Sequence, residues 1–383
     1  MSRSGSTGQR RILFAITSLA GGGAERQLSY LAGGLGALGW EVGVVFTAGG
    51  PNLARLESAR VRLRELAGKG PYDPMVIARL VRVLRAWRPQ LVQSWLPAMD
   101  ISCGLAARIS GVPWVMSERN SALCYLTTWQ ASWRHAWKHD LRRMLARRAR
   151  LCVANSEGGA EMWRAEGVAS LVVPNGLPLD ELDAVPAAAA ADAEQPHWQD
   201  GVALRVLGVG RLHESKNFAA LIKALAQVAQ RRAVQALICG EGQEHAALER
   251  AIHHAGLAGR VVLAGYVPET RLWRLMKTAQ LVVTASRYEG NPNTVLEGMA
   301  CGVPTIASEI TAHREVLDQD SALWFACDDH AGLAARIEQL IADPEATRAR
   351  AARARRFAEA RAVARMVRRY DEVFRAVLAR GSY

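Results

Sequence analysis

Two glutamates, Glu289 and Glu297, are the residues of this chain that point most directly to chemistry. Glu289 follows the apolar run Leu281–Thr284, and Glu297 falls in the first turns of the helix expected next. Pro292 is a good helix initiator, and the helix must end before Gly302. The spacing predicts a helix N-terminus with free backbone N–H groups, flanked by two carboxylates that can accept from hydroxyl groups.

A ligand that satisfies such a site has a negatively charged middle and hydroxyl groups at each end. A nucleoside diphosphate sugar fits this description. A second loop, 208–217, adds two cations, because Arg211 and Lys216 leave a strand end five residues apart. Two cations at a helix start can clamp a diphosphate, and each charge-assisted bond contributes about 1.5–3 kcal/mol. Taken alone, the loop is also compatible with a solvated basic turn.

Glycine turns follow several of the expected strands. The first is 21–23, where the backbone could approach a ligand closely. A dinucleotide fingerprint would need a third glycine at position 26, which is arginine, so this interpretation is disfavoured. The turns at 240–242 and 265–268 could form the floor and base-binding wall of a nucleotide pocket. Each of these turns could also serve only to reverse the chain.

Short apolar runs alternate with helical patterns along the whole chain. Such alternation predicts parallel sheets covered on both faces, in two similar α/β domains with a cleft between them. Ligands of such sheets bind at the carboxyl ends of the strands. The expected strands are 11–17, 41–46, 91–93, 114–117, 151–154 and 171–173 in the first half, and 204–209, 234–239, 261–263, 281–284, 303–306 and 323–325 in the second.

A change in composition separates the two halves. The stretch from Pro178 to Gly201 contains three prolines and a run of alanines without a strand pattern, which is typical of a linker. We therefore expect an N-terminal Rossmann-like domain over 1–176, a linker over 177–201 and a C-terminal Rossmann-like domain over 202–360. The last helix, 361–383, is expected to return to the first domain.

Composition narrows the class of protein. The 383 residues suit two domains, and no apolar run reaches the 18–20 residues or so that span a bilayer. The N-terminus has no signal-peptide pattern, so we expect a cytoplasmic protein. Six scattered cysteines indicate neither disulfides nor a zinc site. The net charge of +12 calls for an acidic partner, but no nucleic-acid-binding signature accompanies it, so no nucleic acid is expected.

Together these segments resemble the large family of retaining glycosyltransferases with the GT-B fold, often called family 4. The resemblance covers nearly the whole chain, and the Glu289/Glu297 segment is its most specific part. The matching pieces are Gly21-Gly22-Gly23-Ala24-Glu25, Asn155-Ser156, Pro174-Asn175-Gly176, Gly210-Arg211-Leu212, Lys216-Asn217, Gly240-Glu241-Gly242 and the segment 286–307.

The resemblance implies a role for each matching residue. Arg211 and Lys216 would hold the donor diphosphate and stabilise the departing nucleotide, while Glu289 would accept from a hydroxyl of the transferred sugar. Glu297 would accept from both ribose hydroxyls. Other residues expected at the donor are Gly22, Gly23, Gly210, Gly240, Gly290, Asn291, Asn293 and Thr294. The family usually needs no metal, so neither a metal nor another cofactor is expected.

One position departs from the family pattern. Many relatives carry a histidine at the end of an N-domain strand, where this chain has Glu118, Arg119 and Asn120. These three residues are the expected contacts to the sugar or the acceptor. The sequence here resembles a subgroup that extends lipid-linked or surface glycans. In a front-face retaining mechanism the leaving phosphate oxygen can take the acceptor proton, so a missing base is compatible with activity.

A basic helical stretch covers Trp133–Arg150. Trp133, Trp137, Leu141 and Leu145 recur four apart on one face, and seven arginines and lysines occupy the other positions. Such a helix suits docking on an anionic membrane surface. It is equally compatible with a helix that packs on the core and exposes a basic face.

The sequence thus predicts an enzyme that moves a hexose or N-acetylhexosamine from a nucleotide diphosphate sugar to a lipid-linked or surface glycan. UDP is the expected nucleotide, although guanine and adenine stay open as bases. The enzyme is expected to be peripheral on the inner face of the cell membrane. The alternative is a catalytically silent GT-B protein that binds nucleotide sugar or membrane as a partner subunit.

Overall fold

The computed structural model describes residues 9–70, 72–120, 133–187, 198–199 and 204–380, with the backbone alone for 133–136. The chain divides into two units, Met1–Gly176 with Val363–Tyr383, and Leu177–Ala362. Each is built on its own parallel sheet, which confirms the predicted α/β class with two Rossmann-like domains. Within the described residues, no helix has the length and apolar character needed to cross a bilayer.

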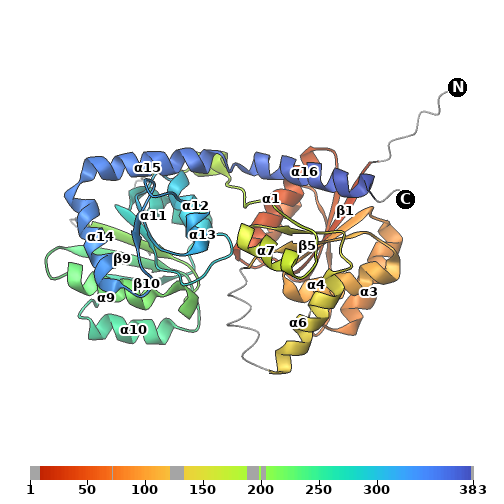
Figure 1. Ribbon diagram of the computed structural model, residues 1–383, viewed down its shortest axis with the longest axis horizontal. Helices are drawn as coiled ribbons and strands as arrows, with labels where there is room; N and C mark the ends of the chain where they lie inside the picture. The colour runs from red at the N-terminus through yellow and green to blue at the C-terminus, as the bar shows by residue number, and fades with distance from the viewer. Residues whose placement is uncertain (1–8, 71, 121–132, 188–197, 200–203, 381–383) are drawn as a thin grey trace. The chain divides into compact units, whose positions relative to one another are not determined.

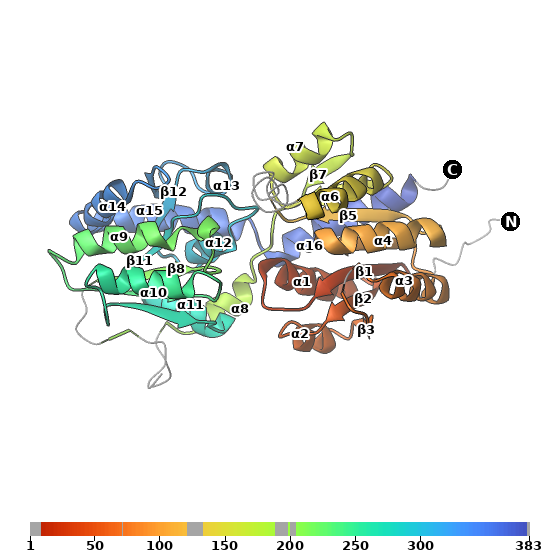
Figure 2. The ribbon, with the colours of Figure 1, turned by 90° about the horizontal axis from the view of Figure 1, so that it is seen from below.

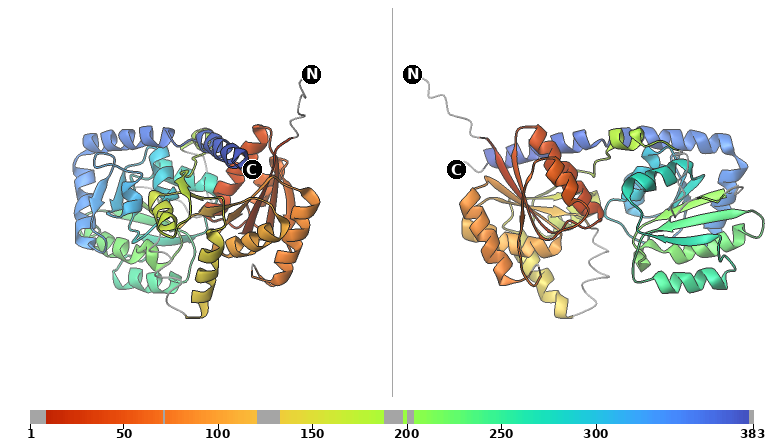
Figure 3. Two further views of the ribbon diagram at one scale, coloured as in Figure 1. Left: turned by 45° about the vertical axis from the view of Figure 1, so that its right-hand side comes forward. Right: turned by 180° about the vertical axis from the view of Figure 1, so that it is seen from behind.

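The first unit contains a seven-stranded sheet in the order β3-β2-β1-β4-β5-β6-β7, and all its pairs are parallel. Its strands are β1 Arg11–Ser18, β2 Glu41–Ala48, β3 Arg62–Glu65, β4 Leu91–Trp95, β5 Trp114–Glu118, β6 Leu151–Ala154 and β7 Ser170–Val172. Its helices are α1 Gly23–Ala37, α2 Leu53–Ser58, α3 Pro74–Trp87, α4 Pro97–Ser110, α6 Trp133–Ala146, α7 Glu157–Ala165 and α16 Val363–Ala379. Helices lie on both faces of this sheet (Figure 3).

Strand alternation divides this unit into two cores. Ile12, Phe14 and Ile16 of β1 face a core that includes α1 and α16, and Leu13 and Ala15 face the core formed with α3, α4, α6 and α7. One strand, β3, was not predicted. It is an edge strand of sequence Arg-Leu-Arg-Glu with mostly exposed side chains, so it lacks the apolar run by which the other strands are recognised.

The second unit contains a six-stranded parallel sheet in the order β10-β9-β8-β11-β12-β13. Its strands are β8 Leu204–Val209, β9 Val234–Cys239, β10 Val261–Gly265, β11 Leu281–Thr284, β12 Thr305–Ser308 and β13 Leu323–Phe325. Its helices are α8 Leu179–Ala184, the 3-10 turn η1 Glu214–Lys216, α9 Phe218–Val228, α10 His245–His254, α11 Glu269–Thr278, α12 Asn293–Ala300, α13 Thr311–Arg314, α14 His330–Ala342 and α15 Pro344–Glu359. In Figure 1, α9 and α10 lie on one side of this sheet and α11, α12 and α15 on the other, which agrees with its two cores.

The segment 177–187, expected to be part of the linker, belongs to the second unit. Its short helix α8 lies beside α11 (Figure 2), because the Lys277 ammonium donates to the carbonyl oxygens of Leu182 and Val185. Leu182 is buried in the same core as α11. The remainder of the expected linker, apart from residues 198–199, lies outside the described residues.

The C-terminal helix α16 packs on the first unit. Its Phe374 ring lies 6.3 Å from Phe14 and 6.1 Å from Trp40, measured between ring centroids. The Trp40 indole also donates to Asp371 at 2.7 Å. Apolar burial and this hydrogen bond together attach α16 to the sheet, about 190 residues along the chain from the last strand of the unit.

A buried ionic network joins the helices of the first unit to its sheet. Arg142 of α6, only 1% exposed, lies 2.6 Å from Asp100 of α4 and 2.9 Å from Glu118 of β5. Asp100 also accepts from Ser94 at 2.5 Å, and the Trp163 indole donates to Glu118 at 2.8 Å. Burial raises the pKa of Asp100 to about 6, although the Arg142 charge opposes this shift. Among the described side chains, Arg142 is the cation that forms ion pairs with both buried carboxylates.

We predict that Arg142→Met lowers the free energy of unfolding by about 3–5 kcal/mol, because it removes the cation that pairs with both buried carboxylates. Urea denaturation at pH 7 measures the change. The matched control is Arg143→Met on the same helix, whose half-exposed ion pair with Glu166 contributes about 1 kcal/mol at most. Equal effects of the two substitutions would contradict the structural role of Arg142.

Candidate active site

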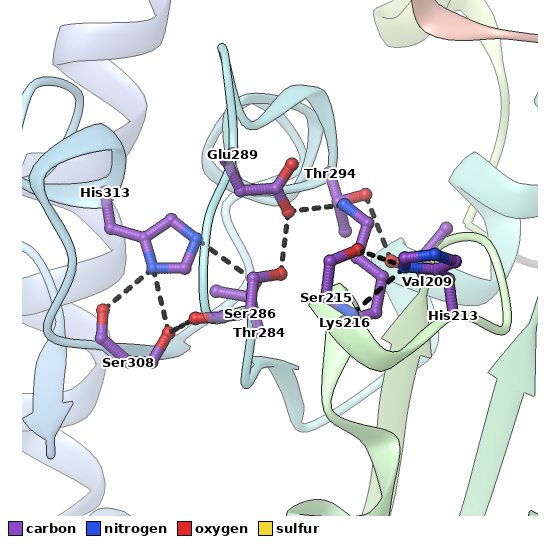
Figure 4. Close-up of polar contacts among 10 residues, drawn as sticks. All are labelled: Val209, His213, Ser215, Lys216, Thr284, Ser286, Glu289, Thr294, Ser308 and His313. Carbon is purple, nitrogen blue, oxygen red and sulfur yellow. Dashed lines mark hydrogen bonds and ion pairs between the residues drawn. The ribbon is translucent and has the colours of Figure 1, made fainter. Parts of the chain in front are cut away.

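The candidate site lies in the second unit, at the carboxyl ends of β8 and β11. The Lys216 ammonium and the Ser286 hydroxyl both donate to Oε1 of Glu289, the latter at 2.7 Å (Figure 4). The Glu289 side chain is 13% exposed and that of Lys216 is 21% exposed. The loop after β8 and the loop after β11 therefore meet in one ion pair that solvent still reaches.

The pKa of Glu289 reflects two opposing influences. Burial by itself raises the pKa, but the charge and hydrogen bond of Lys216, with smaller contributions from His313 and Ser286, outweigh it. The net pKa of Glu289 lies below its ordinary value, so the group is a carboxylate at neutral pH. The site thus holds a fixed negative charge beside a fixed positive one.

Several contacts fix the loop that carries Lys216. The His213 ring accepts from the backbone N–H of Ser215 at 3.2 Å, which caps η1. The backbone N–H of Arg287 donates to the carbonyl oxygen of Ser215 at 2.8 Å, so the two loops are also joined through their backbones. Asn217 follows with a left-handed backbone and donates to Asp328 at 3.0 Å. The turn that carries Lys216 is therefore fixed by hydrogen bonds both before and after the lysine.

Glycines allow the strand ends to approach one another closely. Gly210 has φ +153°, and a Cβ at this position would lie 3.0 Å from Cε of Lys216. Gly240 has φ +144°, and a Cβ there would lie 1.9 Å from the carbonyl oxygen of Gly210. A side chain is thus disfavoured by backbone conformation at both positions, and at Gly240 it is also excluded by space. Gly210 and Gly240 bring the ends of β8 and β9 together under the Lys216 loop.

The N-terminus of α12 completes this edge of the sheet. Thr294 in its first turn donates to the carbonyl oxygen of Val209 at 3.4 Å, which places the turn beside the end of β8. The first N–H groups of a helix have no acceptor within the helix, so an anion is favoured there. The predicted donor residues Gly290, Asn291, Asn293 and Thr294 are half-buried in and before this turn.

Glu297 and Arg211 occupy different environments from Glu289. Glu297 is buried on α12, and its charge contributes, after burial, to the high pKa of Cys301, which is about 12. Arg211 is exposed in the loop after Gly210, and among the described residues no carboxylate forms an ion pair with it. Their predicted roles at the ribose and the diphosphate remain predictions.

Gly22 and Gly23 lie at the start of α1 in the first unit. Gly22 is the N-cap of this helix, and a Cβ there would lie 2.3 Å from a carboxylate oxygen of Glu25. The Ser18 hydroxyl donates to the other oxygen of Glu25 at 3.1 Å. The turn is therefore packed against an acidic side chain, and its predicted contact to a donor remains a prediction.

The structure corrects the expectation for Glu118 and Arg119. Glu118 is fully buried, and its Oε1 accepts from the backbone N–H groups of Arg119 and Asn120, both at 2.8 Å, while Oε2 belongs to the Arg142 network. Arg119 is buried against Trp95 and donates to Ser117 at 2.7 Å and to Tyr370 of α16. Both side chains hold the fold and are unavailable to a sugar. Asn120, half-buried, remains a predicted contact.

The basic helix also differs from its prediction. Arg142 is buried rather than on the solvent face, because it neutralises Asp100 and Glu118. Trp137 and Leu145, expected on one face of the helix, differ in burial, because Trp137 is 54% exposed and Leu145 is buried. The side chain of Trp133 lies outside the described residues.

One functional candidate, His313 of α13, was missed by the sequence analysis. It is buried behind Glu289, and its ring contacts Thr284 and Ser308 at the ends of β11 and β12 (Figure 4). No motif or spacing marks it, since a lone histidine on a four-residue helix resembles any surface residue.

A separate cavity of about 440 Å³ in the second unit is unrelated to this site. Its lining includes Leu204, Ala233 and Gln280, which lie at the amino ends of β8, β9 and β11. The polar residues described above lie at the opposite, carboxyl ends of the same sheet. Ligands of parallel α/β sheets bind at the carboxyl ends of the strands. We therefore place the candidate active site at the Lys216–Glu289 ion pair and the start of α12, and not at this cavity.

Comparison with known proteins supports this assignment. The family model for glycosyl transferases group 1 matches residues 198–357, and the model for glycosyltransferase family 4 matches residues 21–181. The first range contains Lys216, Glu289 and the start of α12. The group 1 model thus covers the sheet of the second unit, and the family 4 model covers most of the sheet of the first unit.

Individual relatives match parts of the chain. The chain is 34% identical over 160 residues to the lipopolysaccharide core biosynthesis glycosyltransferase LpsD of Rhizobium meliloti, which covers 42% of this chain and 44% of that protein. It is 26% identical over 307 residues to the 2-deoxystreptamine glucosyltransferase of Streptomyces kanamyceticus, covering 76% and 78%. The chain spans about half the length, or less, of the first curated relatives that it matches.

Among solved structures, HepE of Anabaena in complex with UDP and glucose has a similar fold. The TM-score is 0.82 at 23% identity, and the similarity covers 96% of this chain and all of that one.

We predict that Lys216→Met destabilises the protein by about 1–3 kcal/mol at pH 7, because it leaves the Glu289 carboxylate buried without a counter-charge. The pKa of Glu289 is lowered in the native protein, so the stabilisation is present above the ordinary pKa of 4.5 and is lost as the pH falls through the native pKa. The loss should therefore be smaller near pH 4 than at pH 7.

Urea denaturation of both proteins at the two pH values measures this difference. The matched control is Lys223→Met, which removes an exposed lysine from α9 and should be nearly neutral at both. A loss of stability independent of pH would show that Lys216 does not govern the ionisation of Glu289.

Proposed function

The chain belongs to the group 1, family 4 glycosyltransferases with the GT-B fold, and on that premise we propose that it transfers a sugar from a nucleotide diphosphate donor. The observation that carries the proposal is the Lys216–Glu289 pair beside the first turn of α12. The transferred group is a hexose or N-acetylhexosamine, and the transfer retains the anomeric configuration. UDP is the favoured nucleotide.

The capacity of the two side chains for hydrogen bonding supports this proposal. An ammonium has three donors, and the Glu289 pair uses one of those of Lys216. The others are available to the oxygens of a diphosphate, for which the first turn of α12 and the exposed Arg211 supply further positive potential. Oε1 of Glu289 is occupied by Lys216 and Ser286, which leaves Oε2 as the oxygen that would accept from a sugar hydroxyl.

In the proposed reaction the acceptor hydroxyl attacks the anomeric carbon from the face that the diphosphate leaves. The bond from that carbon to the phosphate oxygen breaks, the bond to the acceptor oxygen forms, and the acceptor proton passes to the departing phosphate oxygen. Lys216 and Arg211 stabilise the charge that develops on the diphosphate. Because Glu118 and Arg119 are buried and paired, this route requires no base from the segment 118–120.

The names of relatives support the choice of substrates. One structural neighbour was crystallised with UDP and glucose, and one relative acts in lipopolysaccharide core biosynthesis. We therefore propose a UDP-sugar as donor and a lipid-linked or surface glycan as acceptor. No metal or other cofactor is proposed, since Lys216, Arg211 and the helix N-terminus offer the positive charge that a diphosphate needs.

A face of α6 further supports contact with a membrane. Trp137 and Met144 lie seven residues apart on the helix and are 54% and 57% exposed, and Lys138 stacks on Tyr72 at 4.3 Å. Arg143 and Arg147 share Glu166, so part of the basic charge of this helix is neutralised. We propose that Trp137, Lys138 and Met144 rest on an anionic bilayer surface, with the protein peripheral on the inner face of the cell membrane.

We predict that Lys216→Met lowers the rate of donor turnover by about 10²–10³-fold, because it removes a charge that stabilises the leaving group. Glu289→Gln and Arg211→Met should each lower it by about ten- to a hundredfold. Turnover is measured as nucleotide release from UDP-, GDP- and ADP-sugars with a glycan acceptor. The matched controls are Arg260→Met, at an exposed position, and Glu338→Gln, at a half-buried one, both away from the site.

Wild-type rates in all three variants would end the assignment. Binding of UDP without turnover over the full donor and acceptor panel would instead favour a catalytically silent GT-B subunit.

We predict that the double substitution Trp137→Ser and Met144→Ser weakens binding to vesicles that contain phosphatidylglycerol by about tenfold or more, because it removes the apolar anchor. Co-sedimentation with vesicles measures the binding, with purely zwitterionic vesicles as the lipid control. Tyr266→Ser removes an equally exposed aromatic side chain from the second unit and should have no effect. Unchanged binding by the double variant would exclude this face.

A further inference from the structure

His313 is a buried polar residue connected to the Glu289 carboxylate through Thr284 and Ser286. Its Nδ1 lies 2.8 Å from the carbonyl oxygen of Ser308, and its Nε2 lies 3.2 Å from the hydroxyl of Thr284. A carbonyl oxygen only accepts, so Nδ1 carries a proton and donates to Ser308, while Nε2 pairs with the Thr284 hydroxyl, a group that both donates and accepts. Both ring nitrogens are therefore used within the protein.

The surroundings of the ring favour its neutral form. Burial lowers the pKa of His313, and the positive charge of Lys216 acts in the same direction, while Glu289 and the hydrogen bond to Ser308 oppose the shift. A neutral imidazole with its proton on Nδ1 would donate to the Ser308 carbonyl and accept from the Thr284 hydroxyl.

The contacts of His313 converge on Ser286. The hydroxyl of Ser308, which is also 3.3 Å from the His313 ring, donates to the carbonyl oxygen of Ser286 at 2.6 Å. On the other side Thr284, the second partner of the ring, lies 3.5 Å from the Ser286 hydroxyl. Ser286 in turn donates to Oε1 of Glu289 at 2.7 Å (Figure 4). The imidazole thus bridges the ends of β11 and β12 on either side of the residue that holds the carboxylate.

We propose that His313 is a positioning residue for Glu289, acting through Ser286, Thr284 and Ser308 to fix the direction of the carboxylate oxygen that faces the transferred sugar. This inference rests on the proposed function of Glu289 as the acceptor for a sugar hydroxyl. Packing alone would be served by an apolar side chain of similar size, and such a replacement would leave Thr284 and the Ser308 carbonyl without their partner. The imidazole instead locks two strand ends in one hydrogen-bonded arrangement.

The direct test compares His313→Phe with His313→Asn. Phenylalanine fills the space without polar atoms, whereas the asparagine amide can still donate to the Ser308 carbonyl. We expect His313→Phe to lower kcat by about ten- to a hundredfold and to weaken binding of the UDP-sugar, with binding of UDP itself unchanged, because UDP lacks the sugar that Glu289 contacts. His313→Asn should recover most of the loss. Calorimetry with UDP and UDP-glucose and steady-state kinetics provide the measurements, and thermal melting confirms that each variant is folded.

A double-mutant cycle separates positioning from a general structural effect. In the Glu289→Gln background, His313→Phe should have little further effect on kcat, since the carboxylate that it positions is already lost. Equal losses in the two backgrounds, or losses of UDP and UDP-sugar binding in parallel, would overturn the proposal.

A measurement without ligand keeps this inference distinct from the proposed function. The pKa of Glu289, followed by NMR of the ¹³C-labelled carboxylate, should be higher in His313→Phe than in His313→Asn. Both variants lack the histidine charge that lowers this pKa, but only His313→Phe fails to hold Ser286 and its hydrogen bond to the carboxylate. Equal pKa values in the two variants would refute the positioning role. A higher value in His313→Phe, in a protein that neither binds nor turns over any nucleotide sugar, would uphold it and refute only the proposed activity.

Discussion

The ion pair between Lys216 and Glu289 is the interaction on which the candidate site depends. It closes two loops that are more than 70 residues apart in the chain, and it keeps a half-enclosed carboxylate ionised against the cost of burial. The glycine turns at the ends of β8 and β9, the cap at His213 and the backbone bond from Arg287 all serve to bring the ammonium to this point. The first turn of α12 adds its positive end at the same edge. In the proposed function, a diphosphate and a sugar hydroxyl are recognised together because these charges are fixed beside each other.

The first unit uses the same residue types for a different purpose. Glu118, Asp100 and Arg142 are carboxylates and a cation in close contact, as in the active site, yet they are sealed from solvent and every oxygen of Glu118 accepts from a protein donor. Lys216 and Glu289 keep donors and an oxygen directed to a partly exposed surface. Accessibility and unused hydrogen-bonding capacity, rather than residue type, distinguish a group that can act on a ligand from one that holds the fold.

The strong positive charge of the chain is likewise distributed among several uses. Arg142 is internal, Arg143 and Arg147 are paired, and Arg119 stacks on Trp95 while it anchors α16. Arg211 is exposed, and the proposed function assigns it to the donor and assigns the face of Trp137, Lys138 and Met144 to a membrane. Net charge alone therefore overstates the surface available to an acidic partner.

The sequence by itself determined the class of fold and nearly every strand, and it singled out Glu289 and the cationic loop as candidates, because apolar runs, glycine turns and the spacing of two glutamates are local signals. That Lys216 pairs with Glu289, 73 residues along the chain, was decided by the tertiary structure. The sequence missed β3, whose charged edge carries no such signal, and it placed Glu118, Arg119 and Arg142 where ligands or solvent would meet them. Only the tertiary structure decided those positions, since a charged side chain is buried or exposed according to partners that come from distant parts of the chain. The role inferred for His313 also depends on partners from distant parts of the chain. Its significance comes from Thr284, Ser286 and Ser308, which meet at the histidine because two parallel strands end side by side.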